Sequence, residues 1–281
     1  MQTLTQIELA VETIINLRPA YKQILTFYKA VFRIQEESLS TLNISPIIID
    51  SDLLRLKQDN ELPLIDPSEF IIDMASAGQI FEKICDLSQK LAPELASNAS
   101  SMKIAVSKGK LELISLFTAI LNNNEKKLAE LSISLNIPLN EFYLFSSLCM
   151  SPSIKTCAKQ LESYFFIIPE FKKGYCPICG SRPCLASLDQ EGRQFLHCSL
   201  CFHQWNFPRI ECVFCSNTDT DTQQYFYNEE EKEYRVKLCD KCRQFIKVVD
   251  LRQLNRKFSP YLETLATMHL DIQAGEKGYS L

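Results

Sequence analysis

The sequence contains, at Cys176-Pro177-Ile178-Cys179-Gly180, the first of four Cys-x-x-Cys pairs. The other three pairs are Cys198/Cys201, Cys212/Cys215 and Cys239/Cys242. Eighteen residues separate the first two pairs and twenty-three separate the last two, which are lengths that suit hairpins. A tetrahedral metal site takes four thiolates at about 2.3 Å, and two hairpin-linked pairs supply them. The sequence therefore predicts two four-cysteine metal sites, the first pair joining the second and the third joining the fourth.

The residue that follows each pair is part of the same tight turn. Gly180 follows the first pair and adopts a positive φ at little cost. Phe202, Ser216 and Arg243 stand at the corresponding place after the other three pairs. A side chain makes positive φ less favourable, so these three turns are expected to be less ideal.

Cysteine usage agrees with metal binding rather than disulfides. Only three of the twelve cysteines, Cys85, Cys149 and Cys157, precede residue 176, and they are expected to lie in a core. Met1 to Gln6 lack the layout of a signal peptide, and the apolar runs are too short to span a membrane. We therefore expect a cytoplasmic chain without stable membrane insertion, in a reducing compartment where clustered cysteines favour metal.

The sequence does not decide the identity of the two bound metal ions, which is either iron or zinc. Most four-cysteine sites in cytoplasmic proteins hold structural zinc, which stabilises modules too small to bury a sufficient core. Iron in a rubredoxin-like module would also carry one electron. Four thiolates in a tetrahedron suit both ions, so ligand chemistry does not choose between them.

The remainder of the chain reads as helices. Apolar residues recur at helical spacing after Pro19, after Asp66-Pro67-Ser68 and over 111–121 and 126–135. Ser151-Pro152 predicts a helix start, with the helix running to about Ile168 and closed by Pro169. The fold class is a mainly α N-terminal domain, two small β-rich rubredoxin-like or zinc-ribbon modules and a C-terminal helix. The expected boundaries are 1–170 for the helical domain, 171–211 and 212–256 for the metal modules, and 257–281 for the C-terminal helix.

Few other residues are candidates for chemistry. Cys184 is expected to be a small buried residue rather than a spare ligand, and His197 to lie outside a full ligand shell. Trp205 is expected to pack between the modules or over a metal site. Lys241, Arg243 and Lys247 suggest a solvated basic face or an offset to thiolate charge. The sequence shows no phosphate loop, metalloprotease helix or nucleophile elbow, so we predict no catalytic residues and no enzyme.

The charge of the cysteine-rich region argues against nucleic-acid binding. Residues 171–258 contain fourteen basic and eleven acidic side chains, a net charge of +3. Eight thiolates and two divalent ions bring that charge close to −1. A phosphate-binding module normally has a clear basic excess, so we expect no nucleic-acid partner.

The cysteine-rich region resembles the formate dehydrogenase accessory protein family, FdhE. The resemblance lies in the four pairs, in Ser181-Arg182-Pro183, in Trp205 and Arg209, and in Leu265 to Asp271 with Glu276-Lys277-Gly278-Tyr279. It covers about the last 110 residues closely, and Arg18-Pro19-Ala20-Tyr21 matches more loosely. Ser216 departs from the family, because glycine is common there, and Cys184 is an extra thiol.

The resemblance implies a cytoplasmic maturation factor that binds the catalytic subunit of formate dehydrogenase during assembly. It implies a helical N-terminal domain, two rubredoxin-like modules and the eight paired cysteines as metal ligands. Two alternatives stay open: an electron-transfer protein with redox-active iron, and a nucleic-acid-binding zinc-ribbon protein. A homodimer is compatible with the sequence, which does not fix the oligomeric state.

Overall fold

A computed structural model describes residues 4–165 and 171–281, and these divide into two compact units. The first unit comprises residues 1–47 and 66–160, and the second comprises 48–65 and 161–281. The second unit thus includes a short segment from the helical half of the chain. The domain boundaries expected from the sequence at 170, 211 and 256 stay predictions.

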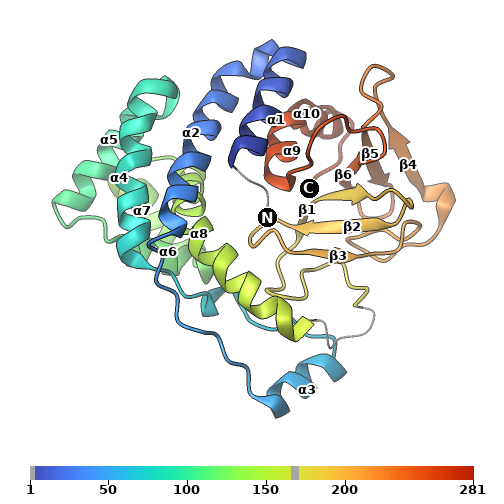
Figure 1. Cartoon of the computed structure of the whole chain (residues 1–281), viewed down its shortest axis with the longest axis horizontal. Helices are drawn as coiled ribbons and strands as arrows, with labels where there is room; N and C mark the ends of the chain where they lie inside the picture. The colour runs from blue at the N-terminus through green and yellow to red at the C-terminus, as the bar shows by residue number, and fades with distance from the viewer. Residues whose placement is uncertain (1–3, 166–170) are drawn as a thin grey trace. The chain divides into compact units, whose positions relative to one another are not determined.

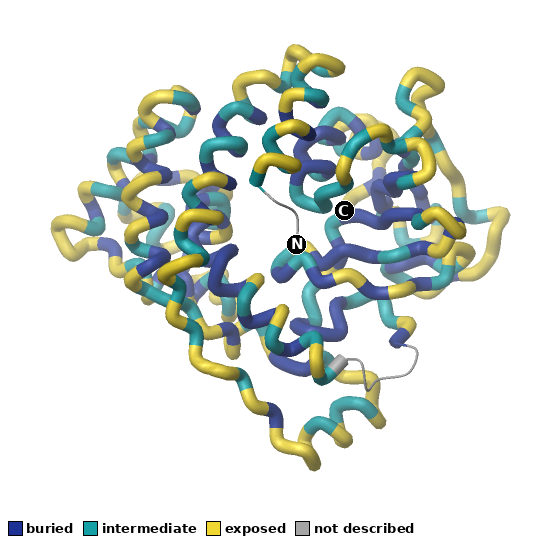
Figure 2. The backbone as a smooth tube through the Cα atoms, viewed as in Figure 1, coloured by how far each residue is buried: buried dark blue, intermediate teal, exposed yellow. Residues whose placement is uncertain are grey.

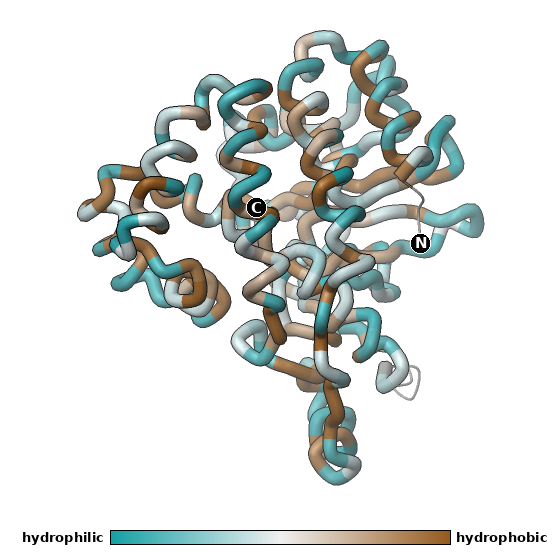
Figure 3. Tube along the Cα trace, turned by 60° about the vertical axis from the view of Figure 1, so that its left-hand side comes forward, coloured by the Kyte–Doolittle hydropathy of each residue, from teal (hydrophilic) through white to brown (hydrophobic). Residues whose placement is uncertain are grey.

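The first unit is helical (Figure 1). Its elements are α1 (Leu4–Leu17), η1 (Pro19–Tyr21), α2 (Lys22–Leu39), η2 (Pro67–Glu69), α4 (Met74–Leu91), α5 (Pro93–Ser107), α6 (Leu113–Leu121), α7 (Glu125–Leu135) and α8 (Leu139–Phe165) up to residue 160, the end of α8 belonging to the second unit. Helix α2 packs against α1 and α4, and α4 packs against α5. Brown and teal alternate along these helices in Figure 3, as expected for helices that each bury one apolar face.

Two sequence signals that predicted the start of a long helix have other roles in the structure. Asp66 caps only the single 3-10 turn η2, while the long helix α4 begins later and is capped by Asp73, whose carboxylate accepts from the Ser76 amide. Pro152 does not start a helix, because it lies inside the 27-residue helix α8. The prediction of a helix start at Ser151-Pro152 was therefore wrong. The neighbouring Ser153 and Ile154 are each 1% exposed, and packing of this kind outweighs the lost backbone hydrogen bond. The expected end at Ile168 and Pro169 lies outside the described residues.

The second unit is built on a six-stranded sheet of order β3-β2-β1-β6-β5-β4. The strands are β1 (Pro183–Leu188), β2 (Gln194–Cys198), β3 (Gln204–Asn206), β4 (Gln223–Phe226), β5 (Tyr234–Cys239) and β6 (Gln244–Asp250). Strands β1 to β3 form one antiparallel module and β4 to β6 form another. The modules join through parallel pairing of β1 with β6, in which Ala186 lies opposite Val248. Two metal-site modules therefore share one continuous sheet.

Helices cover one face of this sheet. A core of Tyr234, Val236, Leu238, Leu270 and Ala274 joins β5 to α10 (Met268–Glu276). The C-terminal segment forms two helices rather than the single one expected, since α9 (Pro260–Ala266) ends at Thr267 before α10 begins. The sheet strands appear largely buried in Figure 2. The expected fold class is confirmed: a mainly α first part, two β-rich cysteine modules and a helical C-terminus.

The second unit also contains α3 (Ser51–Asp59) and η3 (Thr220–Thr222). Asp50 caps α3 by accepting from the amides of Asp52 and Leu53. The segment after α3 pairs with the first cysteine turn, because the Leu64 amide donates to Pro177 O at 2.9 Å and the Ile65 amide donates to Ile178 O at 2.9 Å. A remote stretch of chain thus supports the first cysteine pair.

Candidate metal centres

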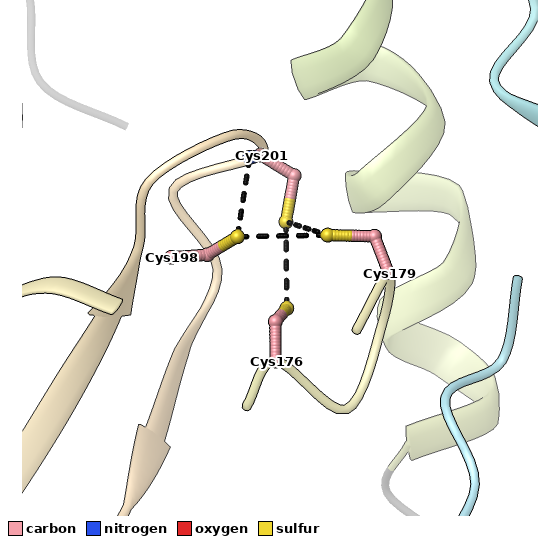
Figure 4. Close-up of side chains that lie close together, drawn as sticks. All are labelled: Cys176, Cys179, Cys198 and Cys201. Atoms are coloured by element: carbon pink, nitrogen blue, oxygen red, sulfur yellow. Dashed lines mark hydrogen bonds between the residues drawn. The ribbon is translucent and has the colours of Figure 1, made fainter. Parts of the chain in front are cut away.

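Four buried sulfur atoms gather at the end of the first module (Figure 4). The Sγ atoms of Cys176 and Cys201 lie 3.6 Å apart, those of Cys179 and Cys198 lie 3.5 Å apart, and those of Cys179 and Cys201 lie 3.7 Å apart. All four cysteines are at most 3% exposed. Cys176 and Cys179 come from the turn before β1, Cys198 is the last residue of β2, and Cys201 lies in the turn that follows. We call this group site 1.

A second group, site 2, stands at the corresponding place in the second module. The Sγ atoms of Cys212 and Cys242 lie 3.7 Å apart, as do those of Cys215 and Cys239. Cys212 and Cys239 are buried, whereas Cys215 and Cys242 are half-buried. Site 2 is therefore closer to solvent than site 1. The structure thus groups the cysteine pairs as expected, the first with the second and the third with the fourth.

Both groups have the dimensions of a tetrahedral metal site. Four sulfur atoms at about 2.3 Å from one ion lie about 3.8 Å from one another, close to the separations in both sites. Burial raises the pKa of the Cys176 thiol well above its ordinary value, so without a metal ion this group favours the neutral thiol. A divalent cation reverses that preference, since it binds thiolates directly. The clusters can therefore hold two metal ions, and the assignment of the eight cysteines as ligands stays a prediction.

The four cysteine turns repeat one local geometry. Gly180, Phe202, Ser216 and Arg243 all have positive φ, between 54° and 72°. The amides of Gly180, Ser216 and Arg243 each donate to the carbonyl of the first cysteine of their pair, at 2.8 to 2.9 Å. Three of the turns therefore carry a side chain in the left-handed region, as the sequence indicated, and keep the same backbone as the glycine turn.

Backbone amides also reach sulfur in site 1. The amides of Leu200 and Cys201 each lie 3.4 Å from the Sγ of Cys198. Such donors spread the charge of a thiolate and favour its deprotonated form. They come from the turn itself, so the four-residue motif supplies both ligands and their hydrogen-bond donors.

A buried lysine that was not predicted from the sequence supports site 2. Lys237 is 4% exposed, and its Nζ donates to Arg209 O at 2.9 Å and to Glu211 O at 2.8 Å. Burial lowers the pKa of Lys237, and the nearby Cys212 and Cys239 oppose that shift. The lysine thus fixes the backbone just before Cys212 and places positive charge beside the thiols. Its position between Val236 and Leu238 in an apolar strand is the sequence feature that could have indicated a buried lysine here.

The other candidate residues lie outside both clusters. The Cys184 thiol lies 3.4 Å from His197 O, and burial raises its pKa to about 12, so it remains a thiol. His197 is 1% exposed, its Nε2 lies 2.8 Å from Ser187 Oγ, and burial lowers its pKa to about 3. Trp205 is buried in β3 and donates from Nε1 to Lys173 O at 2.9 Å. All three are packing residues of the first module.

The basic cluster expected beside the fourth pair does not form one face. Lys247 is 4% exposed and its Nζ lies 2.7 Å from Asp271 Oδ2, so it belongs to the interface between β6 and α10. Arg243 lies over the ring of Tyr279, at 4.0 Å from the ring centroid. Lys241 is exposed. The alternation of side chains along β6 places Lys247 on the helix-covered face, which explains the difference.

Gly174 packs directly against the backbone of the third cysteine pair. A Cβ atom at this position would lie 1.7 Å from Val213 O and 2.9 Å from Val213 C, inside the third cysteine pair. Because both atoms are backbone, they cannot rotate away, so we expect Gly174→Ala to destabilise the second unit by about 3 kcal/mol or more. Thermal unfolding at saturating metal measures the effect. Gly275→Ala is the matched control, because no atom lies within 4 Å of its added Cβ; an equal loss in both variants would contradict the expectation.

The fold and the two sulfur clusters define the class of protein: a helical unit joined to a paired rubredoxin-like or zinc-ribbon unit. Comparison with known proteins agrees. Residues 175–209 match the family described as "FdhE, central domain". The chain is 27% identical over 266 residues to an FdhE homologue of Aquifex aeolicus, covering 93% of this chain and 87% of the relative. It is 34% identical over 110 residues to an FdhE homologue of Haemophilus influenzae, covering 38% of this chain and 35% of the relative.

A solved structure extends the likeness to the fold. The crystal structure of the FdhE protein from Pseudomonas aeruginosa matches with a TM-score of 0.66 at 19% identity, over 99% of this chain and 94% of that chain. The chain is thus similar to FdhE proteins in sequence along nearly its whole length and in fold. The resemblance stated from the sequence is therefore confirmed. No helix within residues 4–165 and 171–281 is both long and apolar enough to cross a membrane.

Proposed function

We propose that this protein is a non-enzymatic maturation factor for formate dehydrogenase that binds the catalytic subunit during assembly. The observation that carries the proposal is the alignment with an FdhE homologue across 93% of the chain, which includes the helical unit and both cysteine clusters. The family resemblance supplies the partner. The described clusters are four-sulfur sites whose shells leave no open position for a substrate, which suits structural rather than catalytic ions.

The eight cysteines act in this proposal as ligands of two ions. Zinc or iron at these sites supplies folding energy, because the small modules gain their order from the ligand bonds. Cys176, Cys179, Cys198 and Cys201 hold one ion, and Cys212, Cys215, Cys239 and Cys242 hold the other. The sheet that joins the two modules then presents a rigid surface to the partner.

Deleting the chromosomal copy tests the proposed function. We expect formate-dependent dye reduction to fall at least tenfold while the catalytic subunit is still synthesised. Expression of the wild-type chain from a plasmid restores activity, and the same plasmid carrying a frameshift provides the control. Normal dehydrogenase activity in the deletion strain would overturn the proposal.

Electron transfer is the second candidate function, and the exposure of site 2 favours it. Half-buried Cys215 and Cys242 bring that cluster near solvent, where electron exchange with a partner is direct. This function requires iron, because zinc has no redox chemistry. Elemental analysis after anaerobic purification, with visible absorption before and after dithionite, tests it. Colourless protein with two zinc ions per chain would exclude it.

A further inference from the structure

The two cysteine modules repeat the same strand order, and only one of the two equivalent strand edges is paired within the sheet. In each module a cysteine turn is followed by two strands, then by a second cysteine turn and a third strand. Strand β4 in the second module therefore corresponds to β1 in the first, and β6 corresponds to β3. The outer edge of β1 pairs in parallel with β6, whereas β4 is the terminal strand of the sheet, as Figure 1 shows.

The backbone groups on the outer edge of β4 follow from the ladder. The Asp240 amide donates to Thr222 O at 2.9 Å, so the groups of Thr222 face β5. In an antiparallel pair every second residue faces the partner, which leaves the C=O of Gln223 and the N–H and C=O of Tyr225 on the outer edge, while the Gln223 N–H donates to Thr220 O in η3. On the outer edge of β1, the Leu188 carbonyl accepts from the amide of Leu251, the residue after β6, at 2.9 Å. The parallel pairing of β1 with β6 thus shows how a strand can add to the equivalent edge of β4.

A groove lies on the face of the sheet opposite α9 and α10, next to this edge. Its volume is about 860 Å³, and its lining crosses the sheet from Leu188 and Val248 to Tyr225 and Tyr227. A second hollow of about 470 Å³, lined by Ile210, Gln223 and Tyr225 among others, follows the β4 edge. Tyr225, Tyr227 and Ile210 are 53%, 61% and 64% exposed. Exposed aromatic and apolar side chains beside an open strand are features of peptide-binding edges.

The groove is cationic. Arg209, Lys232 and Arg235 line it, against the single carboxylate of Glu229. Arg235 is 40% exposed at its side chain and lies 3.5 Å from the buried carboxylate of Asp250, so its guanidinium is held in place while still facing solvent. Tyr225 lines the same groove as the Arg209 and Arg235 side chains. A ligand at this edge should therefore carry negative charge.

We propose that β4 binds an extended acidic segment of a partner protein, which adds to the sheet in parallel to β4 as β6 adds to β1. Main-chain hydrogen bonds form to the C=O of Gln223 and to the N–H and C=O of Tyr225. Alternate side chains of the added strand lie on the same face as Tyr225, and their carboxylates reach Arg209 and Arg235. The proposal deepens the proposed function, on which it rests for the identity of the partner, because it assigns the surface that receives the client subunit.

A second copy of the chain is the competing occupant. Its β3 edge corresponds to β6, so a head-to-tail contact between β3 and β4 would build a ring or an open filament. Strand β3 has only three residues, compared with seven in β6, which offers few bonds for such a contact. Light scattering across a range of concentrations decides this point. Concentration-dependent growth that Tyr225→Pro abolishes would overturn the acidic-peptide proposal in favour of self-association.

Fluorescence anisotropy with a labelled octapeptide of alternating glutamate and valine tests binding to the metal-loaded full chain. We expect saturable binding that Tyr225→Pro reduces at least tenfold, because proline removes the outward N–H without touching the β5 ladder. Tyr225→Phe is the matched control and should bind as the wild type does. Equal binding by the proline variant would overturn strand addition. Circular dichroism and metal content confirm that each variant is folded.

A second variant tests peptide binding through a side chain and does not alter the backbone of β4. Arg209→Glu should weaken the peptide about tenfold, whereas Lys126→Glu, an equal charge reversal on exposed α7, should leave binding unchanged. Full displacement by inorganic phosphate at equal ionic strength would instead identify a small-anion site and overturn the proposal.

A spin label on the peptide N-terminus tests the direction of the added strand. It should broaden the Gln223 amide resonance more than that of Tyr227, and the reverse would overturn the parallel orientation.

The two proposals fail in different ways. If deletion leaves formate dehydrogenase active but the octapeptide binds through Tyr225 and Arg209, the proposed function fails and the edge site stands. If deletion abolishes dehydrogenase activity but the Tyr225→Pro chain restores it and the peptide does not bind, the edge site fails alone.

Discussion

Cys179→Ser is expected to release one of two bound metal ions and to unfold the sheet-bearing unit at ordinary temperatures. All four cysteines of site 1 are buried, so water cannot readily replace the missing ligand. Structural zinc sites contribute an apparent free energy of about 10–16 kcal/mol, as large as the whole stability of a typical domain. Elemental analysis should give close to one ion per chain, and circular dichroism should show loss of strand signal.

The loss of stability caused by a cysteine-to-serine change should depend on how deeply that cysteine is buried. Cys242→Ser removes a half-buried residue of site 2, where water can approach the ion, so we expect a smaller loss of melting temperature than for Cys179→Ser. Cys184→Ser is the control, because this thiol lies in the same module but outside the cluster. It should keep two ions. Two ions and an unchanged melting temperature in Cys179→Ser would contradict the assignment of site 1.

Local chemistry explains why the cysteine turns could be predicted from the sequence. A Cys-x-x-Cys pair folds its own turn, and the residue after it must adopt positive φ whatever the surroundings. Gly180 makes this visible in the sequence, and Phe202, Ser216 and Arg243 follow because the sulfur geometry repeats. The ligand set, the pairing of the turns and the hairpins between them all depend on residues close together in the chain.

The union of the two modules could not be predicted in this way. It depends on parallel pairing of β1 with β6, whose residues lie far apart in the sequence. Nothing in the local pattern of either strand specifies a parallel partner, since both read simply as buried strands. The same limit applies to Leu64 and Ile65, which pair with the first cysteine turn from a remote segment.

Burial also overrode local signals in the helical half. Pro152 and Asp66-Pro67 are both strong helix-start signals, yet one lies inside α8 and the other caps a single turn. The competing factor in α8 is its core, where Phe142, Phe145 and Leu161 are each at most 1% exposed and fix the helix on both sides of the proline. A propensity of a few kcal/mol gives way to such packing.

Glu263→Ala is expected to give the second large effect, through a buried ion pair at the helix-covered face of the sheet. Both carboxylate oxygens of Glu263 bind Arg256, one of them at 2.7 Å, and the Tyr234 hydroxyl donates to Glu263 Oε2 at 2.7 Å. The side chains of Glu263 and Arg256 are 0% and 8% exposed. Removing the carboxylate leaves the buried Arg256 guanidinium without its counter-charge, although it still donates to the Tyr234 hydroxyl, and this costs about 3–5 kcal/mol.

Thermal unfolding at saturating metal measures this loss, and Glu191→Ala is the matched control. Glu191 lies 3.1 Å from Arg193, but both side chains are more than 60% exposed, so that pair should contribute at most about 1 kcal/mol. The double change Arg256→Met with Glu263→Leu should recover much of the stability, because it removes both charges together and refills the space with apolar atoms. If Glu263→Ala and Glu191→Ala melt alike, the buried pair does not hold α9 to the sheet. If the double variant is less stable than Glu263→Ala alone, the cost lies in lost polar contacts rather than in the unpaired charge.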